Sequence, residues 1–222
     1  GRIGSRYNSA MNNDQRNDSP GGNAPGSIRR RLGEWAPALL FVLLVLAARS
    51  TLADHYHVPS GSMEQALLPG DHVLVDKSAF GWRVPFTGYE LVEGDRARPG
   101  DVVIFDSPAD EVRLIKRVVA VGGQHVAVRR GRVFIDGRAL TVPGVPAVER
   151  YGPKRIELRL DHGGGPDFGP VEVPVGAVLV LGDHRGNSRD GRAFGFVPED
   201  ALYGRARGVF WRTGEGPTWR PL

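Results

Sequence analysis

Short runs of β-branched and apolar residues, most of them separated by glycine or proline, recur from residue 71 onward and limit what this chain can fold into. No helical segments alternate with these runs, so the pattern does not support a parallel sheet. It predicts a mostly β fold with an antiparallel sheet. Residues 139–175, which Pro and Gly punctuate, are expected to form a small inserted β lobe or long loops. The predicted strands are 72–75, 102–105, 114–121, 126–128, 133–135 and 177–181, with a hairpin loop at 129–132 and a tight turn at 136–137.

One apolar run, which begins at Trp35, precedes this β-rich part and lies shortly after Arg29, Arg30 and Arg31. As a helix, residues 35–48 would reach only about 21 Å, whereas residues 35–53 would reach about 28 Å, close to a hydrocarbon core of about 30 Å. The favoured hypothesis is one N-terminal transmembrane helix whose basic flank stays in the cytoplasm. A signal peptide that is cleaved near residues 51–53 and a buried helix of a soluble protein are the alternatives.

The positive charge of the chain is concentrated ahead of the β-rich part. Residues 1–53 carry seven Arg and three acidic residues, whereas residues 54–222 balance 22 basic against 22 acidic residues. This distribution does not indicate a nucleic-acid-binding domain. We expect a disordered basic head at 1–34, a transmembrane anchor at 35–53 and an exported β domain at 54–222. Because the chain has no Cys, disulfides, thiol nucleophiles and thiolate metal sites are excluded.

Two polar features stand out against this background. Ser60 and Ser62 flank a glycine just after the apolar run, where the simplest interpretation is a turn. Lys116 is one of only three lysines against 26 arginines, and strand alternation places it on the face of Leu114 and Val118, opposite Arg117. Burial favours the neutral amine, which can accept a proton from a serine hydroxyl. A lysine at a sheet edge that extends its amine into water is the alternative.

A dense polar loop at 182–192 forms a third candidate segment, although a solvated turn with local ion pairs has the same composition. Together the three segments resemble the type I signal peptidase family, membrane-anchored serine proteases that remove signal peptides. The resemblance rests on residues 59–63 and 67–71, 98–103, 115–118 and 182–198, which occur in the family's order. It extends from the apolar run to about residue 210.

The resemblance implies an antiparallel β catalytic domain with Ser62 as nucleophile and Lys116 as general base. Ser60 would stabilise the oxyanion together with the Ser62 backbone N–H. Ser188 would orient the Lys116 amine. The supporting residues would be Asp183 and the pair Asp190 and Arg192. Pockets for small side chains at substrate positions −1 and −3 would be lined by Val58, Pro59, Met63, Leu67, Leu114 and Ile115.

The same resemblance implies precursors with signal peptides as substrates and membrane lipid as a partner. We expect a monomer in the bacterial inner membrane, with the N-terminus cytoplasmic and the catalytic domain periplasmic, and no nucleic acid, metal or cofactor. Four short segments or single residues depart from the family pattern without removing a catalytic atom. They are Gln65-Ala66, Gly122-Gly123-Gln124, His184 (usually Asn) and Gly186 (usually Asp).

Three competing hypotheses remain at this point. Ser62 with His184 or His57 as base would be a different serine protease arrangement. A metal site formed by Asp54, His55 and His57 has weak support, because the spacing does not place the three residues on one helical face. The chain could also be a catalytically impaired, membrane-tethered β domain that binds a partner.

Overall fold

The structure is a computed structural model that describes residues 35, 37–42, 53–83, 90–92 and 94–222. The chain divides into two compact units, Gly1–Val45 and Leu46–Leu222. In the first unit, residues 35 and 37–42 are helical and exposed. A search of the described residues finds no helix with the length and apolar character needed to cross a membrane. The predicted head at 1–34 and most of the predicted anchor at 35–53 lie outside the described residues, and residue 53 belongs to a strand.

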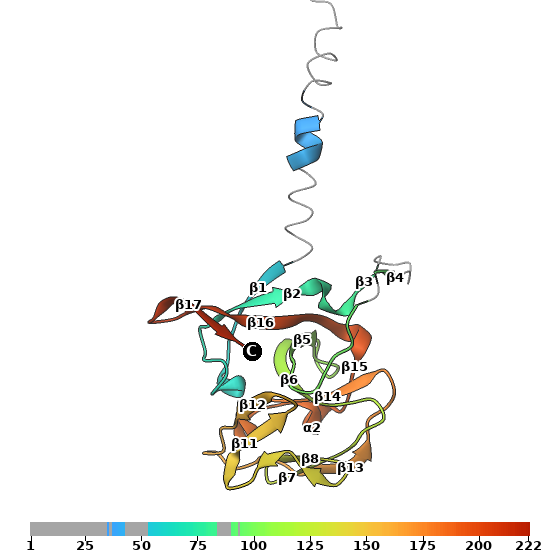
Figure 1. The fold of residues 1–222 in the computed structure, drawn as a ribbon, viewed down its shortest axis with the longest axis vertical. Helices are drawn as coiled ribbons and strands as arrows, with labels where there is room; N and C mark the ends of the chain where they lie inside the picture. The colour runs from blue at the N-terminus through green and yellow to red at the C-terminus, as the bar shows by residue number, and fades with distance from the viewer. Residues whose placement is uncertain (1–34, 36, 43–52, 84–89, 93) are drawn as a thin grey trace, which may run out of the picture. The chain divides into compact units, whose positions relative to one another are not determined.

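The second unit consists mostly of antiparallel sheets, which confirms the predicted fold class (Figure 1). Its main sheet has eight strands in the order β1-β2-β16-β5-β6-β14-β15, with β17 paired to β16. All of the predicted strands are present. The strands of this sheet are β1 (Ala53–His57), β2 (His72–Asp76), β5 (Val102–Asp106), β6 (Arg113–Val121), β14 (Ala177–Leu181), β15 (Val197–Pro198), β16 (Leu202–Arg212) and β17 (Gly216–Pro221).

Smaller sheets complete the unit. A four-stranded sheet has the order β13-β7-β8-β9, a three-stranded sheet the order β10-β11-β12, and β3 pairs with β4. Strands β10 to β13 fall within the predicted lobe at 139–175, but β13 pairs with β7, so this sheet also uses strands that precede the lobe. The bounds are β3 (Trp82–Arg83), β4 (Glu90–Val92), β7 (His125–Arg129), β8 (Arg132–Ile135), β9 (Arg138–Ala139), β10 (Thr141–Val142), β11 (Val145–Tyr151), β12 (Lys154–Glu157) and β13 (Phe168–Glu172).

Among the described residues of this unit, the helical segments are single turns that lie between strands. Four of these are 3-10 helices and one is a short α-helix. They are η1 (Gly61–Met63), η2 (Lys77–Phe80), η3 (Arg185–Asn187), η4 (Glu199–Ala201) and α2 (Gly191–Phe194).

Two tight turns set the register of the four-stranded sheet β13-β7-β8-β9, which we call the second sheet. Arg130 and Gly131 both have positive φ, 51° and 75°, and join β7 to β8 in a two-residue hairpin. Asp136 and Gly137 join β8 to β9 in the same way. Positive φ at both central residues matches the twist of adjacent strands, so these turns are the ones that the sequence predicts.

Apolar packing joins the sheets to one another. One cluster contains residues of three sheets: the main sheet, the second sheet and the three-stranded sheet β10-β11-β12, which we call the third sheet. Its members include Val119, Leu179, Val126, Val133 and Ile156. A second cluster packs the segment around η1 against the main sheet. The segment 58–71, which carries Ser60 and Ser62 and which we call the serine loop, is therefore anchored to the main sheet by buried apolar side chains.

Candidate active site

Ser62 is held in a loop whose ends are fixed by backbone hydrogen bonds and a buried ion pair. The Val58 N–H donates to the Asp71 carbonyl over 2.9 Å, and the Gly70 N–H donates to the Val58 carbonyl over 2.9 Å. The Asp71 carboxylate accepts two hydrogen bonds from Arg212, at 2.9 and 2.7 Å. The loop thus closes on itself, and η1 presents Ser62 with 8% of its surface exposed.

Lys116 lies in β6 between β5 and β14 and approaches this loop from the main sheet. Its Nζ is 2.7 Å from Ser62 Oγ and 3.1 Å from the Ile115 carbonyl oxygen. Ser60 Oγ lies 3.4 Å from Ser62 Oγ. The structure therefore brings together the three residues that the sequence analysis assigns to the nucleophile, the base and the oxyanion.

Burial changes the acidity of the Lys116 amine. The residue is only 3% exposed, and desolvation lowers its pKa from 10.5 to about 8. The carboxylates of Asp190 and Asp183 act in the opposite direction. Each of them is itself paired with a guanidinium, Arg192 and Arg117 respectively. The amine can therefore lose its proton near neutral pH, as a general base requires.

Two buried ion pairs hold the polar loop that follows β14. Asp183 accepts hydrogen bonds from Arg117 at 2.8 and 2.7 Å. Asp190 accepts hydrogen bonds from Arg192, both at 2.8 Å, and a third from the Gly182 N–H at 3.0 Å. Arg117 is a supporting residue that sequence reasoning did not identify, because alternation placed it on the face opposite Lys116.

Breaking the Asp183 pair is expected to destabilise the protein. Asp183→Asn would leave the buried Arg117 guanidinium without a counter-charge, so we expect the free energy of unfolding to fall by about 3–5 kcal/mol. Urea denaturation of the full chain, followed by tryptophan fluorescence, measures this change. Glu215→Gln is the matched control, because the Glu215–Arg220 pair has a similar 2.8 Å contact but is half-exposed, and it should cost less than about 1 kcal/mol. Equal losses in the two variants would contradict the prediction.

Arg185 ties the same loop to the second and third sheets. It is fully buried, and its guanidinium contacts both carboxylate oxygens of Glu149 in β11, at 3.0 and 2.7 Å, and the Gly131 carbonyl. Glu149 also accepts hydrogen bonds from the Tyr151 hydroxyl and from the Val133 N–H. Each oxygen of this buried carboxylate therefore has a donor from outside the loop as well as from Arg185.

Ser188 lies close to the site without the hydrogen bond that the sequence analysis assigns to it. Its Oγ is buried and has no hydrogen-bond partner among the described residues. A Cβ added at Gly182 would collide with both Ser188 Oγ and the Ser62 carbonyl oxygen. Gly182 therefore allows Ser188 to lie against the nucleophile loop, and the role of Ser188 toward Lys116 stays a prediction.

Comparison with known proteins decides the family. A family model described as signal peptidase, peptidase S26, matches residues 32–211. The chain belongs to this signal peptidase family. Membership makes the protein a serine endopeptidase and supports signal-peptide removal as its activity.

Individual relatives agree with the family model. The chain is 33% identical over 198 residues to signal peptidase I of Pseudomonas fluorescens, covering 78% of this chain and 69% of the relative. It is 33% identical over 190 residues to signal peptidase I of Leptolyngbya laminosa, covering 80% of each chain. Signal peptidase I T of Bacillus subtilis is 32% identical over 180 residues, with 80% and 84% covered. A crystal structure of a signal peptidase I from Enterococcus faecalis aligns with 50% of this chain and 97% of its own, at 26% identity and a TM-score of 0.36.

Neither histidine considered as a base contacts the Ser62 hydroxyl through its ring in the described part of the chain. Where the structure describes the chain, the ring nitrogens of His184 face Gly61, Glu64, Asp161 and His162, and not the Ser62 hydroxyl. His57 is exposed, and its ring lies edge-on to that of His72 with the two ring centroids 5.3 Å apart. The structure therefore favours Lys116 over either histidine as the partner of Ser62. The metal grouping of Asp54, His55 and His57 is not among the clusters found in the described residues.

The predicted substrate-contacting residues differ widely in exposure. Pro59 is exposed and Leu114 is half-buried. The other four predicted lining residues belong to the apolar cluster around the serine loop, where they are at most 3% exposed: Val58, Met63, Leu67 and Ile115. Three of them, Val58, Met63 and Leu67, belong to the serine loop itself and pack it against the main sheet, where Ile115 lies in β6. The contact of all four with substrate stays a prediction.

Proposed function

We propose that the protein is a membrane-bound signal peptidase that cleaves precursors with Ser62 as nucleophile and a neutral Lys116 as general base. The observation that carries this proposal is the 2.7 Å separation of Lys116 Nζ and Ser62 Oγ, both in buried side chains. Family membership supports the overall reaction, and the geometry supports the choice of residues.

The reaction follows from these positions. Neutral Lys116 Nζ takes the proton of the Ser62 hydroxyl while Oγ forms a bond to the scissile carbonyl carbon. The carbonyl electrons move to oxygen, and the resulting oxyanion accepts hydrogen bonds from the Ser60 hydroxyl and the Ser62 N–H. Lys116 then gives its proton to the leaving amine as the C–N bond breaks. The same amine, now neutral, then takes a proton from water while the water oxygen bonds to the acyl carbon of the ester. The bond from that carbon to Ser62 Oγ breaks, Lys116 returns the proton to Oγ, and the carboxylic acid product leaves.

Supporting residues keep this arrangement in place. The pairs Asp183–Arg117 and Asp190–Arg192 hold the loop from Gly182 onward, whose His184 N–H donates to the Ser62 carbonyl oxygen over 3.1 Å. The Ser188 hydroxyl oxygen is proposed to accept a hydrogen bond from the Lys116 amine, which orients the amine and leaves its lone pair for the Ser62 proton. These residues act as positioning residues.

Topology fits a substrate presented at a membrane. If residues 35–53 span the inner membrane, Ser62 follows within nine residues, at most about 32 Å of extended chain. We propose that the chain is a monomer with its N-terminus cytoplasmic, its β domain periplasmic and lipid as a neighbour. Such a nucleophile would cut precursors just outside their apolar segment.

Small residues at positions −1 and −3 are the proposed specificity. We expect the full chain in detergent to cleave a precursor with Ala at both positions, and to cleave the same precursor with Leu at −1 at least about 100-fold more slowly, because the shallow pockets lack room for the added carbons. Mass spectrometry of the released N-terminus identifies the cut bond. Leu at +2 is the control substrate and should be cleaved at the original rate. Equal cleavage with Ala and Leu at −1 would contradict the assignment, and no cleavage of any precursor would favour a partner-binding β domain.

A further inference from the structure

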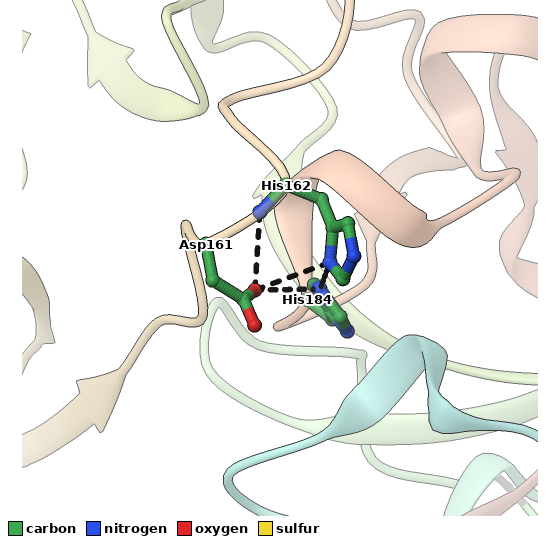
Figure 2. A group of neighbouring side chains, drawn as sticks. All are labelled: Asp161, His162 and His184. Atoms are coloured by element: carbon green, nitrogen blue, oxygen red, sulfur yellow. Dashed lines mark hydrogen bonds and ion pairs between the residues drawn. The ribbon is translucent and has the colours of Figure 1, made fainter.

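Two imidazoles and one carboxylate converge beside the serine loop, and the proposed reaction uses none of them. His184 Nε2 lies 2.9 Å from both His162 Nδ1 and Asp161 Oδ1, and His162 Nδ1 lies 3.3 Å from Asp161 Oδ1. Figure 2 shows the three side chains directed toward one another. Three atoms with lone pairs at these separations need shared protons or a cation between them.

The three atoms His184 Nε2, His162 Nδ1 and Asp161 Oδ1 form a triangle whose size is close to that of one face of a metal coordination polyhedron. In a tetrahedral zinc site with bonds of about 2.0–2.1 Å, neighbouring ligand atoms lie about 3.3 Å apart. The observed edges are 2.9, 2.9 and 3.3 Å. We propose that Asp161, His162 and His184 form a binding site for a divalent transition-metal ion of the zinc class.

Hydrogen-bond partners on the far side of His184 favour the ligating form of its ring. His184 Nδ1 lies 3.3 Å from the Gly61 carbonyl oxygen and 3.3 Å from Glu64 Oε2. Both are acceptors, so the ring proton belongs on Nδ1 and the lone pair on Nε2. A carboxylate or carbonyl behind a ligating imidazole is the usual second layer of a zinc site.

Asp161 is oriented in a similar way. Its Oδ2 accepts a hydrogen bond from Arg159 Nε over 2.7 Å, which leaves Oδ1 on the side of the two rings. Oδ1 also accepts the His162 backbone N–H over 3.1 Å. Arg159 contacts Glu64 as well, so the immediate surroundings hold two carboxylates and one guanidinium. Their net negative charge suits a divalent cation.

The backbone supports the cluster from both sides. The Arg159 N–H donates to the Asp183 carbonyl over 3.0 Å, and the Arg185 N–H donates to the Arg159 carbonyl over 3.1 Å, so the two ligand segments form a parallel bridge. A Cβ at Gly186 would collide with the His162 carbonyl, so glycine at this position allows the close approach. The ligands are thus brought together by the fold before any ion binds.

Ligand chemistry and access narrow the choice of ion. Two nitrogens and one oxygen suit zinc and its neighbours, whereas calcium and magnesium prefer oxygen ligands alone. The His184 side chain is 2% exposed, but those of His162 and Asp161 are 62% and 43% exposed, which gives the ion a path from solvent. Water would complete the coordination. Because the His184 N–H also binds the Ser62 carbonyl oxygen, the ion would stabilise the contact between the two loops.

Cobalt and zinc titrations test this proposal on the full chain in detergent, prepared without a polyhistidine tag. We expect one equivalent of Co²⁺ to give visible absorption bands that Zn²⁺ removes, and Zn²⁺ to raise the melting temperature. His162→Ala should weaken binding at least tenfold and abolish the thermal shift, while metal-free precursor cleavage continues. His125→Ala is the matched control, because His125 is equally exposed and lies near two carboxylates, Asp136 and Glu172; it should bind metal as the parent chain does.

Two outcomes would overturn the site. The parent chain could show no saturable Co²⁺ or Zn²⁺ binding, in which case the cluster is held by protons alone. His162→Ala could bind as tightly as the parent chain, in which case the ion binds elsewhere. Both are read from spectra and melting curves, so they are independent of whether the chain cleaves a precursor.

Discussion

Replacing Ser62 with alanine is expected to lower precursor cleavage by about a million-fold, the loss typical of a serine protease without its nucleophile. The variant removes the one hydroxyl that lies 2.7 Å from the buried amine, and the neighbouring Ser60 hydroxyl is not in contact with Lys116 Nζ among the described interactions. Single-turnover cleavage of a precursor with Ala at −1 and −3, with excess enzyme in detergent, has the range to measure this loss.

Ser60→Ala is the matched control for this experiment. It removes a hydroxyl from the same loop, but one proposed to stabilise the oxyanion, so the expected loss is only about 10²–10³-fold. Both variants should keep the melting temperature of the parent chain, since neither hydroxyl fills the apolar cluster below. A Ser62→Ala chain that retains more activity than Ser60→Ala would show that another group attacks the substrate.

Replacing Lys116 with methionine is the second large change, with an expected loss of at least about 10²–10⁴-fold. Methionine retains much of the volume and removes the amine. The parent chain should become tenfold more active for each pH unit up to about 8, where the Lys116 amine loses its proton, and then level off. The variant should lack this rise. Initial rates between pH 5.5 and 10 measure both profiles, and a residual rate with an inflection near pH 6.5 would instead indicate a histidine base.

The free energy of unfolding of Lys116→Met is the control that separates a catalytic loss from unfolding. The folded-state pKa of Lys116 is about 8 against 10.5 for the free side chain, so burial penalises the protonated amine. Below pH 8 the Lys116 amine is protonated in both the folded and the unfolded chain, so burial of the charge lowers the free energy of unfolding by its full amount. This loss of stability decreases as pH rises from 8 to 10.5, because the folded chain then holds the neutral amine. Lys116→Met should therefore be more stable than the parent at pH 7 by up to about 3 kcal/mol, with no advantage above pH 10.5. A loss of activity in this variant could not then be attributed to unfolding.

The sequence was most informative where local chemistry determines structure. The β-rich runs and the turns at 130–131 and 136–137 occur as predicted, because strand propensity and positive-φ turns depend on neighbouring residues. The position of Lys116 relative to Ser62 came from family resemblance. Strand alternation alone gave the face of Lys116, and left open whether that face meets the serine loop or water.

Contacts between distant segments were not predictable from the residues alone. Alternation assigned Arg117 to the other face, but only the fold shows that Asp183 lies there to pair with it. The adjacent Asp161 and His162 could have been noted as a metal-compatible dipeptide, yet their third partner is 22 residues further on, in a loop fixed by Arg159 and Asp183. Strand β16, which crosses the middle of the main sheet, was also missed, since glycine and arginine interrupt its apolar pattern.

The buried contact between Arg185 and Glu149 has a consequence for protein engineering and for the evolution of the chain. Arg185 lies in the loop that approaches the Ser62 carbonyl, whereas Glu149 lies in β11, outside the main sheet. A shortened enzyme without β7 to β13 would leave this guanidinium without its counter-charge beside the serine loop. Miniaturisation of this peptidase would therefore have to redesign Arg185 together with the deleted strands, and insertions or deletions during divergence should be tolerated at the outer turns of these sheets before they are tolerated at β11.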